Sequence, residues 1–186
     1  MKKERYEVVY KKEIWKKLNE KFNYPNVMQT PKLLKIVVNR GVGETVENSK
    51  AVEIAVEDIR AITGQKPLIT KAKKSISNFK IRVGQPIGVK VTLRSRKMYD
   101  FLSKLLNIAL PKIRDFRGIP VKGFDGNGNY TLGVKEDRIF VEIKERDRAR
   151  GFDITFVTSA KTNEEAFHLL KFFGMPFREE IKISKG

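Results

Sequence analysis

The chain has 186 residues but no cysteine and only one histidine, His168. Without cysteine there can be no disulfide and no thiolate metal site. One histidine cannot build a multi-histidine metal centre, and it leaves little basis for a histidine-dependent catalytic triad. These shortages predict a protein with no metal, no cofactor and no small-molecule substrate.

Uninterrupted apolar runs are missing as well. Residues 1–18 are charged throughout, unlike a signal peptide, and no segment approaches the length of a membrane span. Hydrophobic residues still make up 40% of the chain and include twelve phenylalanines, which is enough for a packed core. We expect a cytoplasmic protein with no membrane partner, folded as one domain over residues 1–178 with a tail over residues 179–186.

Acidic residues are absent from one long stretch, from Ile59 to Tyr99. The whole chain carries 39 basic and 22 acidic residues, a net charge of +17, and eleven of the basic residues fall in this stretch. A basic protein that only needs solubility intersperses both signs. A stretch without carboxylates is typical of a surface that lies against phosphates, and a solvated basic face is the alternative.

The spacing of apolar residues predicts four helices and five strands. Apolar residues at every fourth position from Tyr6 to Phe22 predict the first helix, and Thr162 with Glu165 forms a capping box before the last one. Asn48 or Ser49 can cap the second helix. The predicted helices span 6–22, 52–62, 98–109 and 163–173, and the predicted strands span 32–41, 79–83, 87–93, 138–143 and 152–160.

Two segments interrupt this pattern. Residues 70–78 are predicted to form a mobile basic loop, and the glycine-rich residues 114–138 an irregular excursion with little helix. The mixed order of strands and helices predicts an α+β fold, with an antiparallel-rich sheet and helices packed on one face. The strand 87–93 would bury Val91 and present Lys90 and Thr92, followed by Arg94, on the open face.

No group of residues indicates catalysis. Glu164 and Glu165 fall in the first turn of a predicted helix, where the helix dipole favours acids. His168 falls next to the buried stripe of the same helix, which indicates a structural or surface role. Asp137 has no evident partner. An acid–base pair or an activated nucleophile is therefore not predicted.

The basic stretch favours RNA over a membrane surface. A membrane-surface helix carries Lys and Arg on one side of a 3.6-residue repeat, whereas the repeat here is mostly two. Basic residues interleaved with strand-forming apolar residues are typical of a sheet that contacts RNA backbone and 2′-hydroxyls. Two alternatives remain: an RNA enzyme would turn over its substrate, and a peripheral membrane protein would bind vesicles without competition from RNA.

Four ordered segments resemble a known family. Residues 64–94, GQKPLITKAKKSISNFKIRVGQPIGVKVTLR, closely resemble the signature region of the bacterial-type ribosomal protein L5 family, and residues 24–44, 113–136 and 152–177 match in the same order. The resemblance implies an RRM-like sheet in a non-catalytic protein of the large ribosomal subunit that anchors 5S rRNA in the central protuberance. It also implies contacts with 23S-type rRNA, neighbouring large-subunit proteins, the P-site tRNA and, across an intersubunit bridge, a small-subunit head protein.

The resemblance further implies roles for individual residues. The implied 5S rRNA contacts are Lys35, Asn39, Gln65, Lys90, Thr92 and Arg94. The implied tRNA-facing loop presents Lys71, Lys73, Lys74, Ser75, Ser77, Asn78, Lys80 and Arg82. The implied small-subunit contact involves Arg114, Asp115 and Arg117.

The chain departs from the family pattern in three places. Residues 137–143 are less apolar than is usual, residues 144–151 replace an acidic, tyrosine-containing segment, and residues 179–186 extend past the usual end. The first two departures fall near the region implied to face the small subunit, so they bear on that contact.

Overall fold

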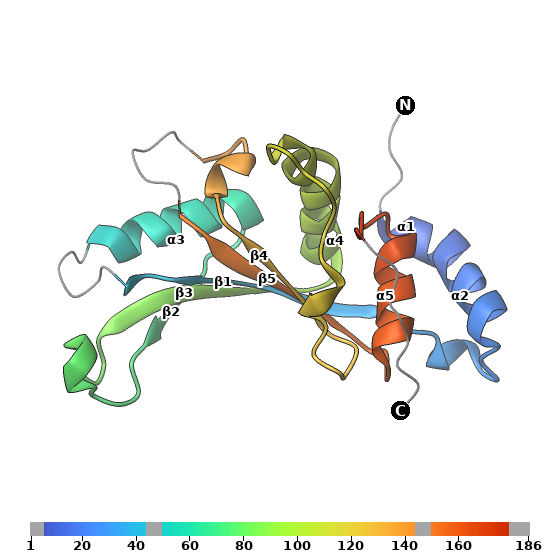
Figure 1. The fold of residues 1–186 in the computed structure, drawn as a ribbon, viewed down its shortest axis with the longest axis horizontal. Coiled ribbons are helices and arrows are strands. Elements are labelled where there is room, and N and C mark those ends of the chain that lie inside the picture. Colours follow the sequence, from blue (N-terminus) through green and yellow to red (C-terminus); the bar gives the residue numbers. More distant parts are fainter. Residues whose placement is uncertain (1–5, 44–49, 144–149, 179–186) are drawn as a thin grey trace. The chain divides into compact units, whose positions relative to one another are not determined.

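The structure is a computed structural model that describes residues 6–43, 50–143 and 150–178, and Figure 1 shows its ribbon. The strands are β1 (Leu33–Gly41), β2 (Leu68–Lys71), β3 (Pro86–Leu93), β4 (Tyr130–Val134) and β5 (Phe152–Thr158). The α-helices are α1 (Tyr6–Val9), α2 (Trp15–Phe22), α3 (Lys50–Thr63), α4 (Ser95–Lys104) and α5 (Asn163–Phe172). The π-helical turns are η1 (Tyr10–Ile14) and η5 (Leu105–Ala109), and 3₁₀ turns include η2 (Val27–Gln29), η4 (Ser77–Phe79), η6 (Leu110–Lys112), η7 (Val121–Gly123) and η8 (Asp137–Ile139). The predicted cap at Asn48 or Ser49 lies outside the described residues.

The five strands form one sheet in the order β2-β3-β1-β5-β4. At its β2 end the pairing with β3 is antiparallel, with Leu68 opposite Lys90 and Thr70 opposite Gly88. The predicted α+β fold with an antiparallel sheet is confirmed.

The chain also divides into two compact units: the first contains residues 1–36, 94–132 and 155–186, and the second contains residues 37–93 and 133–154. Strands β1, β4 and β5 each contribute residues to both units.

The first helix of the first unit contains a π turn. A four-residue repeat rotates by about 40° per step around an α-helix of 3.6 residues per turn, and the wider π turn over Tyr10–Ile14 offsets part of this rotation. Ile14 and Leu18 are consequently both buried, and the Tyr10 ring stacks on Phe173 with centroids 6.0 Å apart. The predicted apolar stripe is confirmed, and the helix ends at Asn23, whose φ of 49° is left-handed.

The last helix of the first unit begins as predicted. The Thr162 side chain accepts a hydrogen bond from the Glu165 amide, and the Glu165 carboxylate accepts one from the Lys161 amide at 2.9 Å. The first bond satisfies an amide of the first helical turn, and the second ties the Glu165 side chain back to the residue before the cap. The helix then buries Ala166, Leu169 and Leu170.

The core of the second unit lies between α3 and the strands. Helix α3 packs on β3, and it buries Val52, Ala55, Ile59 and Ile62. Within this unit α3 covers one face of β1 and β3 (Figure 1). Val89, Val91 and Leu93 point into this core and are at most 2% exposed. The predicted register of strand 87–93 is therefore confirmed.

Two predicted strands are wrong. Phe79 ends η4, and the rest of residues 79–83 take part only in an isolated bridge between Ile76 and Ile81. The strand that pairs with β3 is β2. The alternation of apolar and basic residues over 79–83 was misleading, because Phe79 and Val83 are 68% and 62% exposed. No core lies beneath them that would stabilise a strand. Residues 138–143 instead form the end of η8 and a turn.

One strand was missed inside the glycine-rich segment 114–138. Strand β4 buries Tyr130, Leu132 and Val134 alternately with Thr131 and Gly133. This period-two pattern is short, and the glycines before it and within it obscured it. The expectation of little helix in that segment is consistent with its short 3₁₀ turn η7.

Candidate RNA interface

The open side of β3 in the second unit is polar. Lys90 is exposed and Thr92 partly exposed, while the alternate residues Val89, Val91 and Leu93 are buried. A strand alternates its side chains between two faces, so the packed core fixes where Lys90 and Thr92 point. The polar side chains therefore stand on a backbone that the core holds in place.

Gln65 is brought next to β3 by the end of α3. Gly64 adopts a φ of 65°, which suits glycine, and its amide donates to the Arg60 carbonyl at 2.8 Å. The chain then turns so that the Gln65 side-chain amide donates to the Thr92 carbonyl at 3.1 Å. This bond brings together two residues that lie 27 positions apart and that the family resemblance singled out. The bond uses the side-chain nitrogen of Gln65, and the side-chain oxygen can still accept another hydrogen bond.

Asn39 occupies the corresponding side of β1. It is partly exposed, and its neighbours Val38 and Arg40 are buried on the other side of the strand. The two strands approach closely because Gly88 has no side chain: a Cβ at that position would lie 2.7 Å from the Arg40 carbonyl oxygen. Asn39, Gln65, Lys90 and Thr92 are hereafter called the polar face.

Lys35 and Arg94 belong to the first unit. Lys35 is partly exposed on β1, and Arg94 is exposed at the residue that precedes α4. Arg94 has extended backbone angles, with φ −136° and ψ 163°. Both cationic side chains are thus accessible at the surface of their unit.

Beneath the polar face the second unit contains a buried charge cluster that the sequence reasoning missed. Arg40 is only 1% exposed, and it bonds the Asp58 carboxylate at 2.9 Å, the Asp137 carboxylate, and the Arg150 carbonyl at 3.3 Å. Both carboxylates are also buried. A buried Arg requires such partners because an unpaired charge loses its hydration.

A sequence signal for this cluster was present. Arg40 follows Ile36 and Val38 at two-residue spacing, so the alternation of β1 already placed it on the buried side. Asp58 precedes Ile59 on the apolar stripe of α3, and Asp137 lacked any evident partner in the sequence. The cluster explains why residues 137–143 do not form a strand, since η8 delivers Asp137 to Arg40.

Residues 71–83, the hairpin tip, extend the antiparallel pair of β2 and β3. The Ala72 amide donates to the Gln85 carbonyl at 2.8 Å, and the Gly84 amide donates to the Ala72 carbonyl at 3.0 Å. Further out, the Ser75 hydroxyl accepts from the Val83 amide at 3.0 Å. Hydrogen bonds therefore organise a segment that was predicted to be a loop over residues 70–78.

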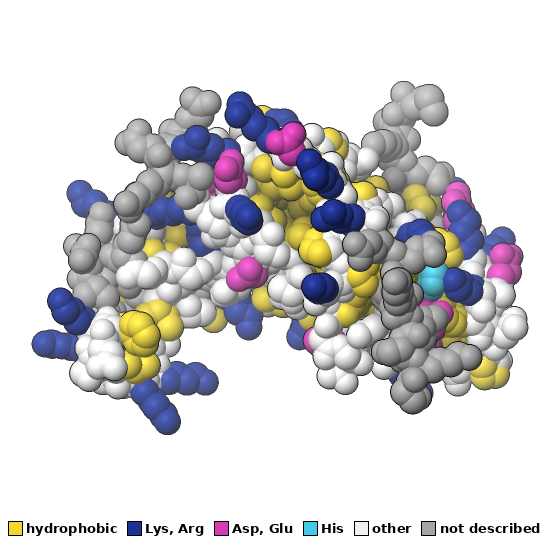
Figure 2. Space-filling view, in the orientation of Figure 1, with side chains coloured by type: hydrophobic (Ala, Val, Ile, Leu, Met, Phe, Trp, Pro, Cys, Tyr) yellow, Lys and Arg dark blue, Asp and Glu magenta, His cyan; other side chains and the backbone are white. Residues whose placement is uncertain are grey.

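The hairpin tip presents basic and apolar side chains together. Ile76, Phe79 and Val83 are 46%, 68% and 62% exposed. Figure 2 shows basic side chains projecting around an apolar patch at this end of the second unit. All the residues implied to face tRNA are exposed here: Lys71, Lys73, Lys74, Ser75, Ser77, Asn78, Lys80 and Arg82.

The residues implied to face the small subunit lie in the first unit. Arg114, Asp115 and Arg117 are exposed in an irregular turn after η6, and Asp115 has a left-handed φ of 52°. Residues 144–149 of the unusual segment lie outside the described residues.

Other candidate residues have structural surroundings. His168 lies 2.7 Å from the Lys21 ammonium and packs edge-on against Phe167. In the part of the chain that the structure describes, no three His, Asp or Glu side chains gather as metal ligands do. Over the same residues, no helix has both the length and the apolar character needed to cross a bilayer.

Comparisons with known proteins agree with this arrangement. The family model described as ribosomal protein L5 matches residues 26–82, and a second model, for the C-terminus of the same ribosomal family, matches residues 86–177. The chain is 61% identical over 170 residues to the large ribosomal subunit protein uL5 of Clostridium tetani (strain Massachusetts / E88), and 59% identical to that of Clostridium botulinum (strain Loch Maree / Type A3). Each alignment covers 90% of this chain and 94% of the relative.

A strongly basic α+β protein with an open polar sheet face has the features of an RNA-binding protein. The two family models together cover almost all of residues 26–177. The chain therefore belongs to the ribosomal protein L5 family, and it is a structural ribosomal protein and not an enzyme.

Proposed function

We propose that this protein anchors 5S rRNA through the polar face, with Lys35 and Arg94 as additional contacts. The protein is a structural component of the large ribosomal subunit and works in the cytoplasm as part of the ribosome. The observation that carries the proposal is the hydrogen bond from the Gln65 side chain to the Thr92 carbonyl, because it holds Gln65 beside the strand that presents Lys90 and Thr92.

These groups suit RNA backbone chemistry. Amide and hydroxyl side chains bond sugar 2′-hydroxyls and phosphates, while Lys90 and Arg94 supply positive charge. Val91 and Leu93 hold the strand from behind, so the polar groups do not need to be ordered when RNA arrives. A pre-organised surface fits a partner that stays bound throughout the life of the ribosome.

The hairpin tip is proposed to contact the P-site tRNA. Its lysines are exposed, and its apolar residues Phe79 and Val83 are exposed too, unlike the buried residues behind β3. Exposed cations attract phosphates over a distance set by the ionic strength, and they release them readily. This property suits a tRNA that must enter and leave at every round of translation.

We also propose contacts with further partners, through smaller parts of the protein surface than the polar face and the hairpin tip. Arg114, Asp115 and Arg117 would contribute to a bridge with a small-subunit head protein. The remaining basic surface would contact 23S-type rRNA and neighbouring large-subunit proteins. Most of the eleven basic residues between Ile59 and Tyr99 are already used by the polar face, Arg94 and the hairpin tip.

Filter binding to isolated 5S rRNA tests the division between the two surfaces. Arg94→Ala removes a charge-assisted contact worth about 1–3 kcal/mol, so affinity should fall roughly 5- to 150-fold. Lys112→Ala, which removes one exposed positive charge elsewhere in the first unit, is the matched control and should change affinity less than about threefold.

The hairpin tip is tested by replacing Lys71, Lys73 and Lys74 together with alanine. This variant should keep 5S rRNA affinity within a few-fold of the unchanged protein, and ribosomes that contain it should retain P-site tRNA less well. Equal losses of 5S rRNA affinity in this variant and in Arg94→Ala would show one continuous 5S rRNA surface instead of two sites.

A further inference from the structure

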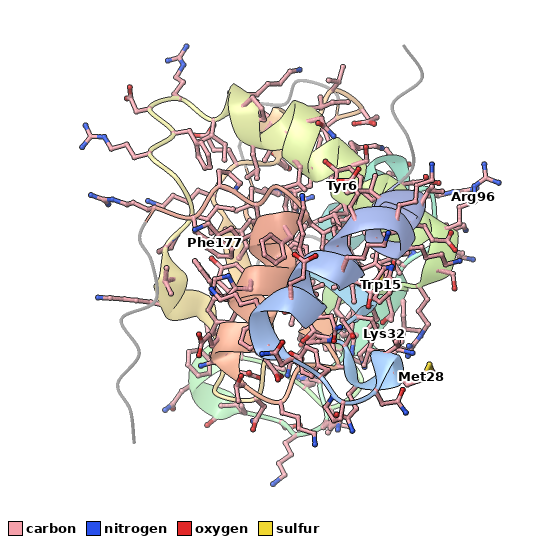
Figure 3. The ribbon with its side chains drawn as sticks, turned by 90° about the vertical axis from the view of Figure 1, so that its right-hand side faces the viewer. Tyr6, Trp15, Met28, Lys32, Arg96 and Phe177 are labelled. Carbon is pink, nitrogen blue, oxygen red and sulfur yellow. The ribbon has the colours of Figure 1, made fainter. Side chains whose placement is uncertain are left out.

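Residues 125–129, hereafter the asparagine loop, connect η7 to β4 in the first unit, and none of the proposed RNA contacts uses them. The loop reads Asp-Gly-Asn-Gly-Asn. An antiparallel bridge between Phe124 and Tyr130 closes its two ends, and the centroids of these two rings lie 4.7 Å apart. Both rings pack on Phe177, which Figure 3 shows beside α5. The loop is therefore a short turn with a fixed base.

An asparagine that precedes a glycine is chemically labile, and Asn127 precedes Gly128. The backbone nitrogen of the glycine attacks the side-chain carbonyl carbon of the asparagine. The new C–N bond closes a succinimide ring, the glycine nitrogen gives up its proton, and the asparagine side-chain nitrogen leaves as ammonia. Water then opens the ring at either carbonyl and leaves aspartate or isoaspartate. Glycine favours the reaction because no side chain hinders the approach of its nitrogen.

The two asparagines that begin and end this part of the loop differ in their surroundings. The Asn129 side chain is held at both ends: its nitrogen donates to the Asp125 carboxylate at 2.7 Å, and its oxygen accepts from the Thr158 amide at 3.3 Å. Asn129 also precedes a tyrosine and not a glycine. The Asn127 side chain, in contrast, is exposed to water. Asn127 is therefore the residue of the loop that is open to this reaction.

The fold requires the glycine that makes Asn127 labile. Gly128 is buried, with a left-handed φ of 76°, and a Cβ at this position would lie 2.6 Å from the Ala160 carbonyl oxygen. Its own carbonyl accepts a hydrogen bond from the buried Thr158 hydroxyl at 2.6 Å. A side chain at position 128 would clash with this packing, so the reactive pair cannot be avoided by a larger residue there.

The nitrogen that would attack is held by Asn163, the first residue of α5. The Asn163 side-chain oxygen accepts from the Gly128 amide at 3.3 Å and from the Gly126 amide at 3.1 Å. The Thr162 side chain caps the same helix and so fixes where Asn163 stands. The Gly128 amide must break its bond to Asn163 before it can lose its proton and turn toward the Asn127 side chain.

We propose that Asn127 is a deamidation site that Asn163 keeps latent in the folded protein. Either product places a second carboxylate near Asp125, and the loss of ammonia makes the change permanent in the absence of repair. Isoaspartate also lengthens the backbone just before Gly128, which displaces the carbonyl that Thr158 bonds. The isoaspartate product has a further consequence, because it is the chemical group that an isoaspartyl methyltransferase recognises. The site is independent of the polar face and the hairpin tip.

Mass spectrometry of aged protein measures the reaction. The purified protein is incubated at slightly alkaline pH and digested with trypsin, and the peptide of residues 123–135 reports the exchange of an amide for a carboxylate. Asn163→Ala removes the acceptor of the Gly128 amide, so deamidation of Asn127 should become about 2- to 10-fold faster. A synthetic peptide of residues 123–135 should react faster still. Folded protein that reacted as fast as this peptide would overturn the proposal.

Two matched variants separate the hydrogen bond from a general loosening of the first unit. Asn163→Asp keeps an oxygen that accepts from the Gly128 amide, so it should react at the rate of the unchanged protein. Leu102→Ala destabilises the same unit from α4 without altering the loop, and it should leave the rate unchanged as well. Equal acceleration in Asn163→Ala and in either control would show that Asn163 does not restrain the reaction.

Methylation identifies the position and the product. An isoaspartyl methyltransferase with labelled S-adenosylmethionine should label aged Asn163→Ala protein. It should not label the variant that combines Asn163→Ala with Asn127→Gln, because glutamine would have to close a larger ring. Asp125 also precedes a glycine, and its isomerisation is the rival source of isoaspartate. Labelling that persisted in the combined variant would assign the reaction to Asp125 and overturn the proposal for Asn127.

Discussion

The polar face and the hairpin tip are both basic parts of the second unit, but their support differs. Behind Lys90 and Thr92, the strand buries Val89, Val91 and Leu93. In the hairpin tip, Phe79 and Val83 alternate with Lys80 and Arg82 in the same way, and they remain exposed. A period-two pattern therefore specifies a strand only where a helix lies behind it to bury the apolar side.

The largest expected effect concerns salt. If the polar face neutralises roughly 6–10 phosphates together with its neighbours, affinity for 5S rRNA should fall by about 10³–10⁵ between 50 and 200 mM salt, with a shallower slope for unpaired RNA. The triple replacement of Lys71, Lys73 and Lys74 should leave this slope unchanged. A flat titration for the unchanged protein would contradict binding through phosphates, and a reduced slope for the variant would place the hairpin tip on 5S rRNA.

The second effect tests the buried cluster beneath the polar face. Arg40→Met leaves Asp58 and Asp137 without their cation, which should lower the free energy of unfolding by about 3–5 kcal/mol. Lys90→Met removes a positive charge from the exposed side of β3 and should cost less than about 0.5 kcal/mol. Urea denaturation measures both, and similar midpoints for the two variants would show that the cluster does not hold the strands.

The third effect compares two valines directly. Val91→Ala should lower the free energy of unfolding by about 1–3 kcal/mol because it opens a void behind the polar face. Val83→Ala in the hairpin tip removes the same atoms from an exposed position and should change it by less than about 0.5 kcal/mol. Thermal melts that showed the larger loss for Val83→Ala would contradict the burial of Val91 and the exposure of Val83.

The smallest effect is confined to the hairpin tip. Ser75→Ala removes the acceptor of the Val83 amide, a hydrogen bond worth about 0.5–1.5 kcal/mol. Hydrogen exchange at Val83 should become about 2- to 10-fold faster, while global stability and exchange in β3 stay the same. Exchange that is already unprotected at Val83 in the unchanged protein would mean that the tip is open in solution.

Much of the fold could be predicted from apolar spacing, and the exceptions have physical causes. The stripe of α3 and the register of β3 were predictable because the apolar residues of each element are buried in a core, which stabilises that arrangement. Strand β4 was missed because glycines precede and interrupt it, and residues 138–143 were misassigned because pairing of Asp137 with Arg40 overrides their strand-like composition.

The candidate site was predictable only in part. Residues of the polar face could be named from the family pattern, but the bond between Gln65 and the Thr92 carbonyl depends on the turn after α3.

The buried cluster also sets an order of events during synthesis. Arg40 and Asp58 are made 18 residues apart, whereas Asp137 is 97 residues beyond Arg40. At about 5–20 residues per second, roughly 4–16 s pass between translation of Asp58 and of Asp137. Throughout that interval the nascent chain holds Arg40 with only one of its two carboxylates. The sheet that carries the polar face can therefore reach its final packing only after η8 has been synthesised.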